Sequence, residues 1–407
     1  MKTNWQTKKL GEVCDFYNGL WRGKNPPYIK VGVIRNTNFT REGNLDDSDI
    51  AYLEVEKKQF ENRKLIYGDI ILEKSGGGPK QPVGRVVIFN KKDGDFSFSN
   101  FTSAIRIKNS RELDFNFLHR FLFFSYISGI TEKMQSHSTG IRNLDSKLYK
   151  SIEIPFPPLP EQHRIVKILD VVFENIEKAK ENAQKNLQNS KELFELYLEN
   201  IFISSGNNWD DKTLGEIATF RNGMNFTKRS RGETIKIVGV KDFQKNFWIP
   251  LENLESVTID GKLNETDYLR ENDILTVRSN GNPKLIGRCM LAGRVIEKIS
   301  HSGFTIRIRL ISNRNFAQYI CHYLKSKIAK KHLIESGTGI NIKSLNQVAL
   351  SSLVIPIPSL KEQKSIVAKL DALSAETKKL EAIYQQKLAD LEELKKSVLK
   401  KAFAGEL

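Results

Sequence analysis

The sequence predicts an α+β protein with two similar strand-rich domains. Two long helices that pair as an antiparallel coiled coil separate the domains, and approximate internal two-fold symmetry relates the two halves. Three features of the 407-residue chain predict this class. The second half repeats the first, each half contains short β-branched runs bounded by turn residues, and each half has one long stretch without proline or glycine.

The internal repeat is clearest where each half begins. Residues 5–12 read W-Q-T-K-K-L-G-E, and residues 209–216, which lie 204 positions later, read W-D-D-K-T-L-G-E. The same shift relates S-G-G-G-P-K at 75–80 to S-N-G-N-P-K at 279–284. A repeat of about 200 residues is large enough to bury its own core. Two copies of one unit suit a partner with two parts, and a bipartite DNA site is the obvious candidate.

The chain is basic and poor in cysteine. It has 64 Lys and Arg against 48 Asp and Glu, a formal charge of +16 that attracts polyanions. Cys14, Cys289 and Cys321 show no CxxC spacing, so we expect reduced thiols in a cytoplasmic protein. We expect neither secretion nor a membrane span, because the chain shows no apolar leader and no run of about 18 apolar residues.

Short β-branched runs predict strands at equivalent places in each half. They are bounded by Gly, Asn and Asp, as strands joined by turns are. The runs lie at 28–34, 68–72 and 103–107, and again at 236–240, 273–277 and 304–308. Aromatic-rich stretches at 115–130 and 316–334 predict a helix after the last strand of each half.

Proline clusters mark the start of the two long helices. Pro155, Pro157, Pro158 and Pro160 exclude helix before Glu161. A helix over 161–203 would extend roughly 65 Å. Apolar residues at spacings of four and three predict coiled-coil seams, which contain Ile165, Leu169, Val172, Ile176, Ala179 and Ala183 in the first helix and Ile366, Leu370, Leu373, Leu380, Tyr384, Leu391, Leu394 and Val398 in the second.

Neither helix can bury its apolar stripe alone, so each needs a partner. Because both follow equivalent points of a two-fold repeat, we predict that they pair with each other, antiparallel. Pairing between two copies of the chain is the alternative, but a partner in the same chain has the higher effective concentration. The expected divisions are a first domain at 1–155, a spacer helix at 156–204, a second domain at 205–355 and a C-terminal spacer helix at 356–407.

One short motif suggests an enzyme instead. Asn25-Pro26-Pro27-Tyr28 matches the N-P-P-Y loop of adenine methyltransferases. In that loop the Asn side chain accepts a hydrogen bond from the amino group of a flipped base, and the Tyr ring stacks on the base. That loop should follow a buried apolar strand, yet G-L-W-R-G-K at 19–24 precedes it here, and the second repeat lacks the motif. Such a short match is a common false positive.

Other possible chemistry is equally weakly supported. The loop at 75–80 lacks the Walker pattern of phosphate-binding loops, although a flexible loop with a terminal lysine can also contact DNA. Glu56-Lys57-Lys58, with Asp46, Asp47 and Asp49 upstream, suggests a nuclease metal site, but it is not duplicated. The six histidines show no metal-ligand spacing. We therefore expect no catalytic residue and no metal site, and interpret the chain as a binding protein.

Variable loops carry the candidate DNA-binding residues. Arg and Asn read guanine and adenine edges, and Lys favours phosphates. The candidates are Trp21, Arg22, Lys24, Arg35, Asn36, Asn38, Lys74, Lys80, Arg142 and Asn143 in the first half, and Lys228, Arg229, Arg231, Lys241, Arg278, Asn280, Lys284 and Asn341 in the second. Because the framework agrees between repeats while these loops differ, the two halves should read different half-sites.

These motifs together resemble the specificity (S) subunits of type I restriction-modification systems. The resemblance covers the whole chain and depends most on P-L-P-E-Q-x-x-I-V at 158–166 and P-S-L-K-E-Q-x-x-I-V at 358–367. L-G-E followed by N-G in each repeat, T-G-I in each repeat, and the ending K-K-A-F-A-G-E-L at 400–407 agree with it.

The resemblance implies two target-recognition domains, each reading half of a bipartite site in double-stranded DNA, with the paired helices as a ruler. It also implies that two methyltransferase (M) subunits and two restriction/translocase (R) subunits join the chain. S-adenosylmethionine and the catalytic residues would belong to those partners, so we expect no cofactor on this chain. A methyltransferase acting through N-P-P-Y, or a purely structural coiled coil without sequence preference, are the alternatives.

Overall fold

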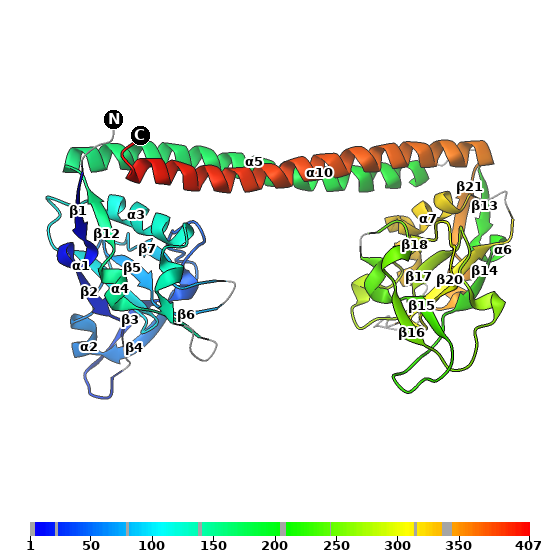
Figure 1. Cartoon of the computed structure of the whole chain (residues 1–407), viewed down its shortest axis with the longest axis horizontal. Helices are drawn as coiled ribbons and strands as arrows, with labels where there is room; N and C mark the ends of the chain where they lie inside the picture. Colours follow the sequence, from blue (N-terminus) through cyan, green and yellow to red (C-terminus); the bar gives the residue numbers. More distant parts are fainter. Residues whose placement is uncertain are drawn as a thin grey trace. The chain divides into compact units, whose positions relative to one another are not determined.

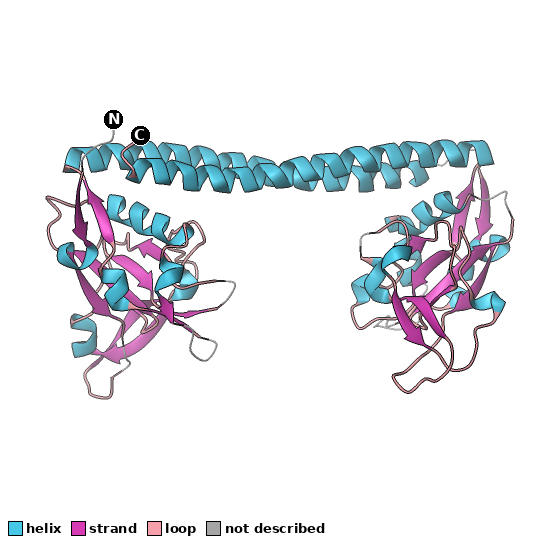
Figure 2. Ribbon diagram, viewed as in Figure 1, coloured by secondary structure: helices cyan, strands magenta, loops and turns pink. Residues whose placement is uncertain are grey.

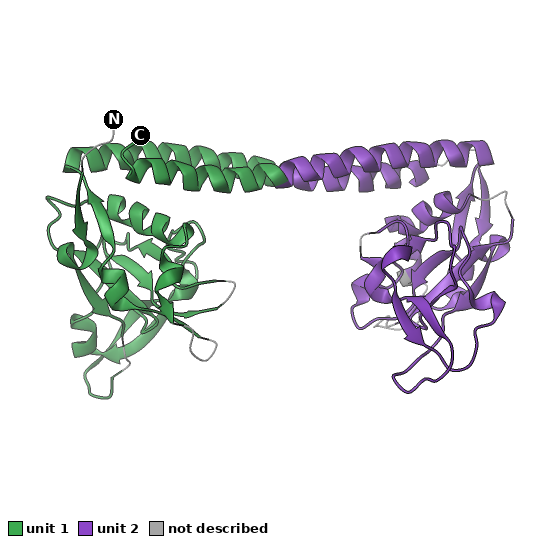
Figure 3. Cartoon of the chain, viewed as in Figure 1, with its two compact units in different colours: residues 1–184, 386–407 green, residues 185–385 purple. Residues whose placement is uncertain are grey.

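The computed structural model describes most of the chain and divides it into two compact units. The described residues are 5–20, 23–78, 81–136, 141–203, 209–244, 246–312, 316–335 and 344–407. Unit 1 contains residues 1–184 and 386–407, and unit 2 contains residues 185–385 (Figure 3). Each unit therefore combines one repeat with parts of both long helices.

Unit 1 is built from short strands and helices in the first repeat (Figure 1). Its strands are β1 (Gln6–Lys9), β2 (Cys14–Asn18), β3 (Tyr28–Ile34), β4 (Ala51–Glu56), β5 (Ile70–Glu73), β6 (Ser75–Gly77), β7 (Val86–Ile88), β8 (Phe96–Phe98), β9 (Thr102–Ile107), β10 (Gln135–Ser136), β11 (Arg142–Leu144) and β12 (Glu153–Phe156). Its helices are α1 (Leu10–Val13), η1 (Asn36–Asn38), α2 (Lys57–Glu61), α3 (Phe115–Ile127), η2 (Thr131–Met134), α4 (Ser146–Lys150) and the first part of α5 (Leu159–Ile203).

Unit 2 repeats the arrangement (Figure 2). Its strands are β13 (Asp210–Thr213), β14 (Ala218–Asn222), β15 (Thr234–Val238), β16 (Glu255–Thr258), β17 (Ile274–Val277), β18 (Cys289–Leu291), β19 (Ile299–His301), β20 (Thr305–Leu310) and β21 (Val354–Ile357). Its helices are α6 (Leu214–Ile217), η3 (Val240–Phe243), η4 (Leu251–Asn253), η5 (Glu265–Asp267), η6 (Pro283–Leu285), α7 (Ala317–Lys325), α8 (Lys327–Glu335), α9 (Gln347–Ser351) and the first part of α10 (Leu360–Phe403).

The sheets of the two units have the same topology. The four-stranded antiparallel sheet is ordered β2-β9-β5-β7 in unit 1 and β14-β20-β17-β18 in unit 2. A three-stranded sheet, β4-β3-β8 or β16-β15-β19, has one antiparallel and one parallel pairing in both cases. A two-stranded ladder, β1-β12 or β13-β21, leads into α5 or α10. The predicted duplication of an α+β unit is therefore confirmed.

Alternate residues of the central strands separate two layers of core. In β5, Ile70 and Leu72 pack with α3, α5 and α10, whereas Ile71 packs with β8 on the other face. Unit 2 repeats this alternation with Ile274 and Leu275 of β17. The period of two in a strand thus places the helices on one face of the four-stranded sheet and the three-stranded sheet on the other.

A buried glutamine attaches each long helix to its unit. Gln162 is fully buried, its Oε1 accepts from the Asp114 amide at 2.8 Å, and its Nε2 donates to the carbonyls of Glu112 and Pro157, both at 2.8 Å. Gln363 is its equivalent: its Oε1 accepts from the Phe316 amide at 2.8 Å and its Nε2 donates to the Pro358 carbonyl at 2.9 Å. The E-Q pair of the repeated motif therefore joins the start of the long helix to the start of α3 or α7.

Within each unit, α5 and α10 pack together in opposite directions. In unit 1, Ile165 and Leu169 of α5 share a core with Leu399 and Ala402, near the end of α10. In unit 2, Leu198 and Phe202, near the end of α5, share a core with Ile366 and Leu370, near the start of α10. The predicted antiparallel pairing inside one chain is confirmed.

Two details of the helix prediction were wrong. First, α5 begins at Leu159 and includes Pro160, because a proline is tolerated in the first turn, where its missing N–H would have had no intrahelical partner.

Secondly, the seam of α10 shifts. Thr377, which the repeat places on the seam as a weak position, is 4% exposed as expected, but beyond it Leu380 and Leu394 are 37% and 47% exposed, whereas Lys395, which is off the predicted seam, is 4% exposed. A helix with 3.6 residues per turn drifts away from a strict heptad, so a pattern extended over about nine turns selects the wrong face in part of the helix.

Candidate nucleic-acid interface

In each unit the predicted loops gather at one end of the four-stranded sheet (Figure 1). In unit 1 this is where β2 and β5 end and β9 begins. Lys74, directly after β5, donates from Nζ to Oδ1 of Asn18, the last residue of β2, at 2.8 Å. We refer to this end, in either unit, as the recognition end.

An exposed phenylalanine stands on a tight turn at both recognition ends. The turns are Ser99–Thr102 and Ser302–Thr305, and in each the Thr amide donates to the Ser carbonyl, at 3.0 and 2.9 Å. The Thr hydroxyl donates to the same carbonyl at 2.8 Å in both. Phe101 and Phe304 are the third residues of these turns and are 44% and 61% exposed.

The phenylalanine turn is bonded to the glycine loop. The Phe101 carbonyl accepts from the amides of Lys74 at 3.0 Å and Ser75 at 3.1 Å, and the Phe304 carbonyl accepts from those of Arg278 at 2.8 Å and Ser279 at 3.3 Å. Both turns are therefore held in the same way. Sequence reasoning did not select them, although the repeated S-x-F-T pattern at 99–102 and 302–305 was a usable signal.

Three candidates of unit 1, Arg35, Asn36 and Asn38, follow the end of β3. Lys24 is exposed near the start of β3, where the amide of the next residue, Asn25, donates to Glu56 at the end of β4. Arg35 donates to the carbonyl of Asp49 at 3.1 Å and to its carboxylate at 3.3 Å. Asn36 is partly exposed, and its Nδ2 lies 3.4 Å from Oε1 of Glu73.

Asn38, in contrast, is engaged inside its own loop. It is 2% exposed, its Nδ2 donates to the carbonyls of Asp46 and Asp49, both at 3.1 Å, and its Oδ1 accepts from the Arg35 amide at 2.9 Å. Asp242 of unit 2 holds the Gly239 amide in the same way at 2.8 Å. We therefore assign Asn38 a structural role as the cap of η1 and remove it from the set that can meet DNA.

Arg142 and Asn143 are on β11, which pairs with β6 beside the glycine loop. Ser75 donates from its hydroxyl to Oδ1 of Asn143 at 2.5 Å. Arg142 forms an ion pair with Glu132 at 3.4 Å. These two residues thus extend the recognition end of unit 1 by a second small sheet, β10-β11-β6.

In unit 2, Lys228, Arg229 and Arg231 are exposed in the loop between β14 and β15. The loop is ordered by its own polar groups: Thr227 Oγ1 accepts from the Arg229 amide at 3.1 Å, and Asp260 accepts from the Arg231 amide at 3.0 Å. Because backbone amides hold the loop, the cationic side chains remain available to an outside partner.

The remaining described candidates of unit 2 follow β15 and β17. Lys241, on η3, forms an ion pair with Glu255, and this contact raises the pKa of Lys241. Asn280 accepts from the Asn282 amide at 2.8 Å, and Asn282 accepts from the Lys284 amide at 3.1 Å. Arg278 is the equivalent of Lys74 in unit 1. Burial lowers the pKa of the Lys74 ammonium group. Trp21, Arg22, Lys80 and Asn341 lie outside the described residues.

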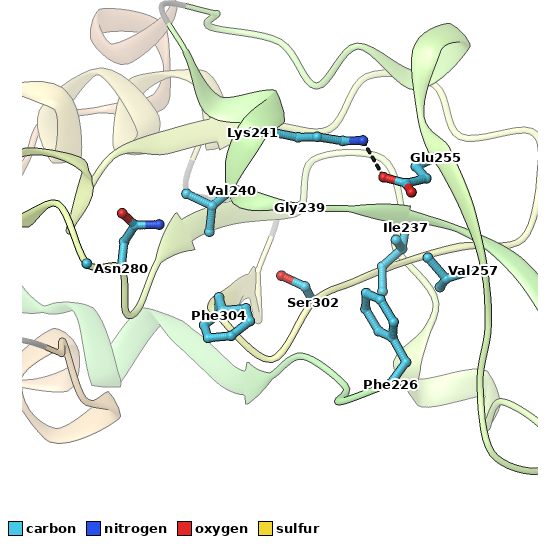
Figure 4. A pocket seen from close by; sticks show the side chains of 11 residues that line it. Phe226, Ile237, Gly239, Val240, Lys241, Glu255, Val257, Asn280, Ser302 and Phe304 are labelled. Atoms are coloured by element: carbon cyan, nitrogen blue, oxygen red, sulfur yellow. Dashed lines mark hydrogen bonds and ion pairs between the residues drawn. The ribbon is translucent and has the colours of Figure 1, made fainter. Parts of the chain in front are cut away.

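A hollow of about 440 Å³ opens at the recognition end of unit 2 (Figure 4). Phe226, Val240 and Phe304 provide apolar walls, and Lys241 and Asn280 provide polar groups. Glu255 also lines the hollow and pairs with Lys241, so the hollow combines an apolar surface with one ion pair and one carboxamide, and a carboxamide suits the edge of a base.

The N-P-P-Y motif and the acidic residues near Asp47 lie on the surface and make contacts with other segments of unit 1. Asn25-Pro26-Pro27 leads into β3 on the surface, the Pro27 carbonyl accepts from the Lys57 amide at 2.8 Å, and Tyr28 is 44% exposed. Asp47 forms an ion pair with Lys91 at 2.6 Å. Among the described residues, no group of three or more His, Cys, Asp or Glu side chains is placed to hold a metal.

Comparisons with known proteins show the family to which this duplicated, basic α+β chain belongs. The family model of the type I restriction modification DNA specificity domain matches residues 2–186 and 206–390. The specificity subunit of type I restriction enzyme StySPI from Salmonella potsdam is 28% identical, over 99% of this chain and 89% of that protein. The EcoKI specificity subunit of Escherichia coli strain K12 is 24% identical over the same shares.

Solved structures show the same fold. A chain from a type I restriction-modification system, studied for complex assembly and conformational transition, has a TM-score of 0.78 at 20% identity and covers 99% of this chain and 98% of its own. The HsdS subunit of Thermoanaerobacter tengcongensis has a TM-score of 0.60 at 19% identity, covering 100% and 98%. The chain belongs to the specificity subunits of type I restriction-modification systems.

Among the described helices, none is long and apolar enough to cross a bilayer.

Proposed function

We propose that this chain is the non-catalytic DNA-recognition subunit of a type I restriction-modification complex and that each unit reads one half of a bipartite site. One observation carries the proposal: both recognition ends use the same backbone contacts, from the phenylalanine turn to the glycine loop, but present different side chains. A common frame with different readers suits two different half-sites. The catalytic groups and their cofactor would belong to partner subunits, acting in the cytoplasm.

A domain exchange tests this division. Residues 1–155 are replaced by the corresponding domain of a relative with a known site, and modified adenines in the host genome are mapped by single-molecule sequencing. We expect a new first half-site with an unchanged second half-site. A change in the second half-site would contradict independent reading.

The paired helices are proposed to set the distance between half-sites. One heptad is inserted after Gln184 in α5 and a second after Gln385 in α10, so that the antiparallel seam stays in register. Seven residues add about 10 Å of helix, or up to about three base pairs. The mapped spacer should lengthen without any change in the two half-sites. As a control, a heptad after Gln184 alone misaligns the seam and should reduce methylation.

The same helices are proposed to dock two methyltransferase subunits, with two restriction/translocase subunits joining the complex. Leu193 of α5 and Leu394 of α10 are equivalent by the repeat and are 48% and 47% exposed, so each helix presents an apolar contact at the same place. Leu193→Lys and Leu394→Lys should each remove one methyltransferase subunit in native mass spectrometry. Retention of both subunits in the double variant would place the docking surface elsewhere.

Methyl transfer by the chain itself is the competing function. The isolated chain is assayed for transfer from S-adenosylmethionine to DNA, with and without Asn25→Ala. We expect no transfer from either. Activity of the chain alone that is lost in the variant would replace the proposal by a catalytic role for N-P-P-Y.

A further inference from the structure

Both recognition ends combine a carboxamide with the exposed phenyl ring. In unit 1 the two groups flank Gly76: a Cβ built there would lie 3.2 Å from Nδ2 of Asn36 and 3.3 Å from Cδ1 of Phe101. Gly76 has a φ of +96°, which also favours glycine. In unit 2, Asn280 and Phe304 line the same hollow (Figure 4).

The two carboxamides come from different loops, although the phenyl rings are equivalent. The position of Asn36 is occupied in unit 2 by Val240, and the position of Asn280 is occupied in unit 1 by Gly76. Inheritance of one residue through the duplication therefore does not explain the two pairs. The repeated combination of amide and phenyl points to a common ligand.

The exposed rings are not explained by packing. Their turns are closed by two hydrogen bonds each, and their carbonyls anchor the glycine loop, so the ring is presented on rigid backbone. The adjacent cations, Lys74 and Arg278, favour a polyanionic partner. An apolar group in such a position suits an apolar feature of DNA, and the major groove offers the 5-methyl group of thymine.

An A·T pair presents the complementary set of groups. An asparagine side chain can donate a hydrogen bond to N7 of adenine and accept one from its N6 amino group. The thymine of the same pair presents its methyl group in the major groove. We propose that Asn36 with Phe101, and Asn280 with Phe304, each read one A·T pair in their half-site, with the ring on the thymine methyl. This inference rests on the proposed function of the two units.

Thymine-to-uracil replacement tests it, because uracil lacks only the methyl group. The chain is purified with its methyltransferase partners, the target is taken from the methylation map, and each thymine of the target duplex is replaced singly. Fluorescence anisotropy should show one position in each half-site where uracil weakens binding about fourfold, the effect of losing one buried methyl group.

Variants connect each position to one ring. Phe304→Ala should abolish the uracil effect in one half-site only, and Phe101→Ala in the other only. Phe→Leu at either position keeps an apolar contact and should retain part of the effect. Ile311→Ala and Ile66→Ala are matched controls, since these residues are 61% and 48% exposed beyond the opposite ends of β20 and β5, and they should leave the effect intact.

The outcomes separate this inference from the proposed function. Uracil tolerated at every position, by a complex that still prefers its mapped site, overturns the A·T inference alone; a ring wedged between base steps would give this result. A wild-type complex without sequence preference overturns the proposed function. Persistence of both uracil effects in folded Phe→Ala variants also overturns the inference.

Discussion

Arg85 in unit 1 and Arg288 in unit 2 occupy equivalent positions but have different partners. Arg85 forms a buried ion pair with Glu73 at 2.7 Å and donates to the carbonyls of Asn36 and Phe39, both at 3.0 Å. In unit 2 the place of Glu73 is taken by Val277, and Arg288 donates instead to the carbonyls of Gln244 at 2.8 Å and Lys284 at 3.3 Å. The same strand end thus supports two different loop conformations.

The opposite ends of the same strands agree between units. Asp69, directly before β5, accepts from Arg106 at 2.7 and 2.8 Å, and Asp273, directly before β17, accepts from Arg309 at 2.7 Å twice. Both carboxylates are 1% exposed. The comparison teaches that the end of the sheet away from the recognition end has the same buried side-chain contacts in both units. The recognition end shares the backbone contacts of the phenylalanine turn but has its own buried side-chain contacts in each unit.

The largest effects should be equal in the two units. Asp69→Ala and Asp273→Ala each leave a partly buried guanidinium without its carboxylate, which we expect to cost about 3–5 kcal/mol in the free energy of unfolding. Hydrogen exchange of peptides from each unit measures the loss in its free energy of unfolding. Asp95→Ala, which removes an exposed ion pair with Lys64, is the control and should cost under about 1 kcal/mol. Unequal losses would contradict a shared frame.

Glu73→Val should destabilise unit 1 by about 2–3 kcal/mol, less than the two Asp variants, because Arg85 keeps its hydrogen bonds to the carbonyls of Asn36 and Phe39. It places in unit 1 the residue that unit 2 already has. Adding Arg85→Met should restore most of the loss, because replacing both members of a buried pair by apolar groups is nearly neutral. If the double variant is no more stable than the single one in urea unfolding, the ion pair is not the cause.

Acid should lower the free energy of unfolding of unit 2 more than that of unit 1. Burial lowers the pKa of His119 in unit 1 to about 4, and of His301 and His322 in unit 2 to about 3. Below pH 6.5 the unfolded chain therefore binds more protons than the folded chain, and stability falls as the pH falls towards 4. At pH 5 each histidine costs about 2 kcal/mol, so unit 2 should lose about 2 kcal/mol more than unit 1.

Hydrogen exchange at pH 7 and pH 5, corrected for the intrinsic rate at each pH, gives both losses. His322→Phe should reduce the acid sensitivity of unit 2 to about that of unit 1. Greater acid sensitivity of unit 1 in the wild-type protein would count against this assignment.

The smallest expected difference lies at the first helix of each repeat. Glu216 accepts from the amide and the hydroxyl of Thr213, at 2.6 and 2.7 Å, whereas Glu12 accepts from the Lys9 amide at 3.0 Å. Thr213→Ala should cost about 0.5–1 kcal/mol, and Lys9→Ala should change stability by only a few tenths. Local exchange in α6 and α1 checks this, and equal effects would mean that the hydroxyl contributes nothing.

Much of the fold could be predicted because its signals are local or repeated. Proline and glycine positions limit the backbone without reference to distant residues, so the long helices and strand runs followed from the sequence. The expected pairing of α5 with α10 depended only on the repeat and on a shared apolar stripe. The buried face of α10 was harder to predict. Lys395 is buried because Glu177 lies 3.6 Å away and Phe123 lies under its ammonium group, and a heptad pattern contains no information on such contacts.

The candidate site could be predicted only as a set of loops. Asn36 and Asn38 are two positions apart and of the same residue type, yet one is partly exposed and the other is 2% exposed. Phe101 was overlooked because aromatic residues are expected in cores, and its exposure depends on a turn whose carbonyl is bonded to residues 74 and 75.

By itself, the sequence determined that two like units and two long helices would form. Proline and glycine restrict the backbone within a few residues, and a repeated sequence predicts a repeated fold. Only the tertiary structure decided which side chains meet at the recognition ends and which are used internally. Those choices depend on contacts between distant residues, such as Lys74 with Asn18 and Phe403 with the aromatic side chains of α3. Packing of such contacts is a property of the folded chain as a whole.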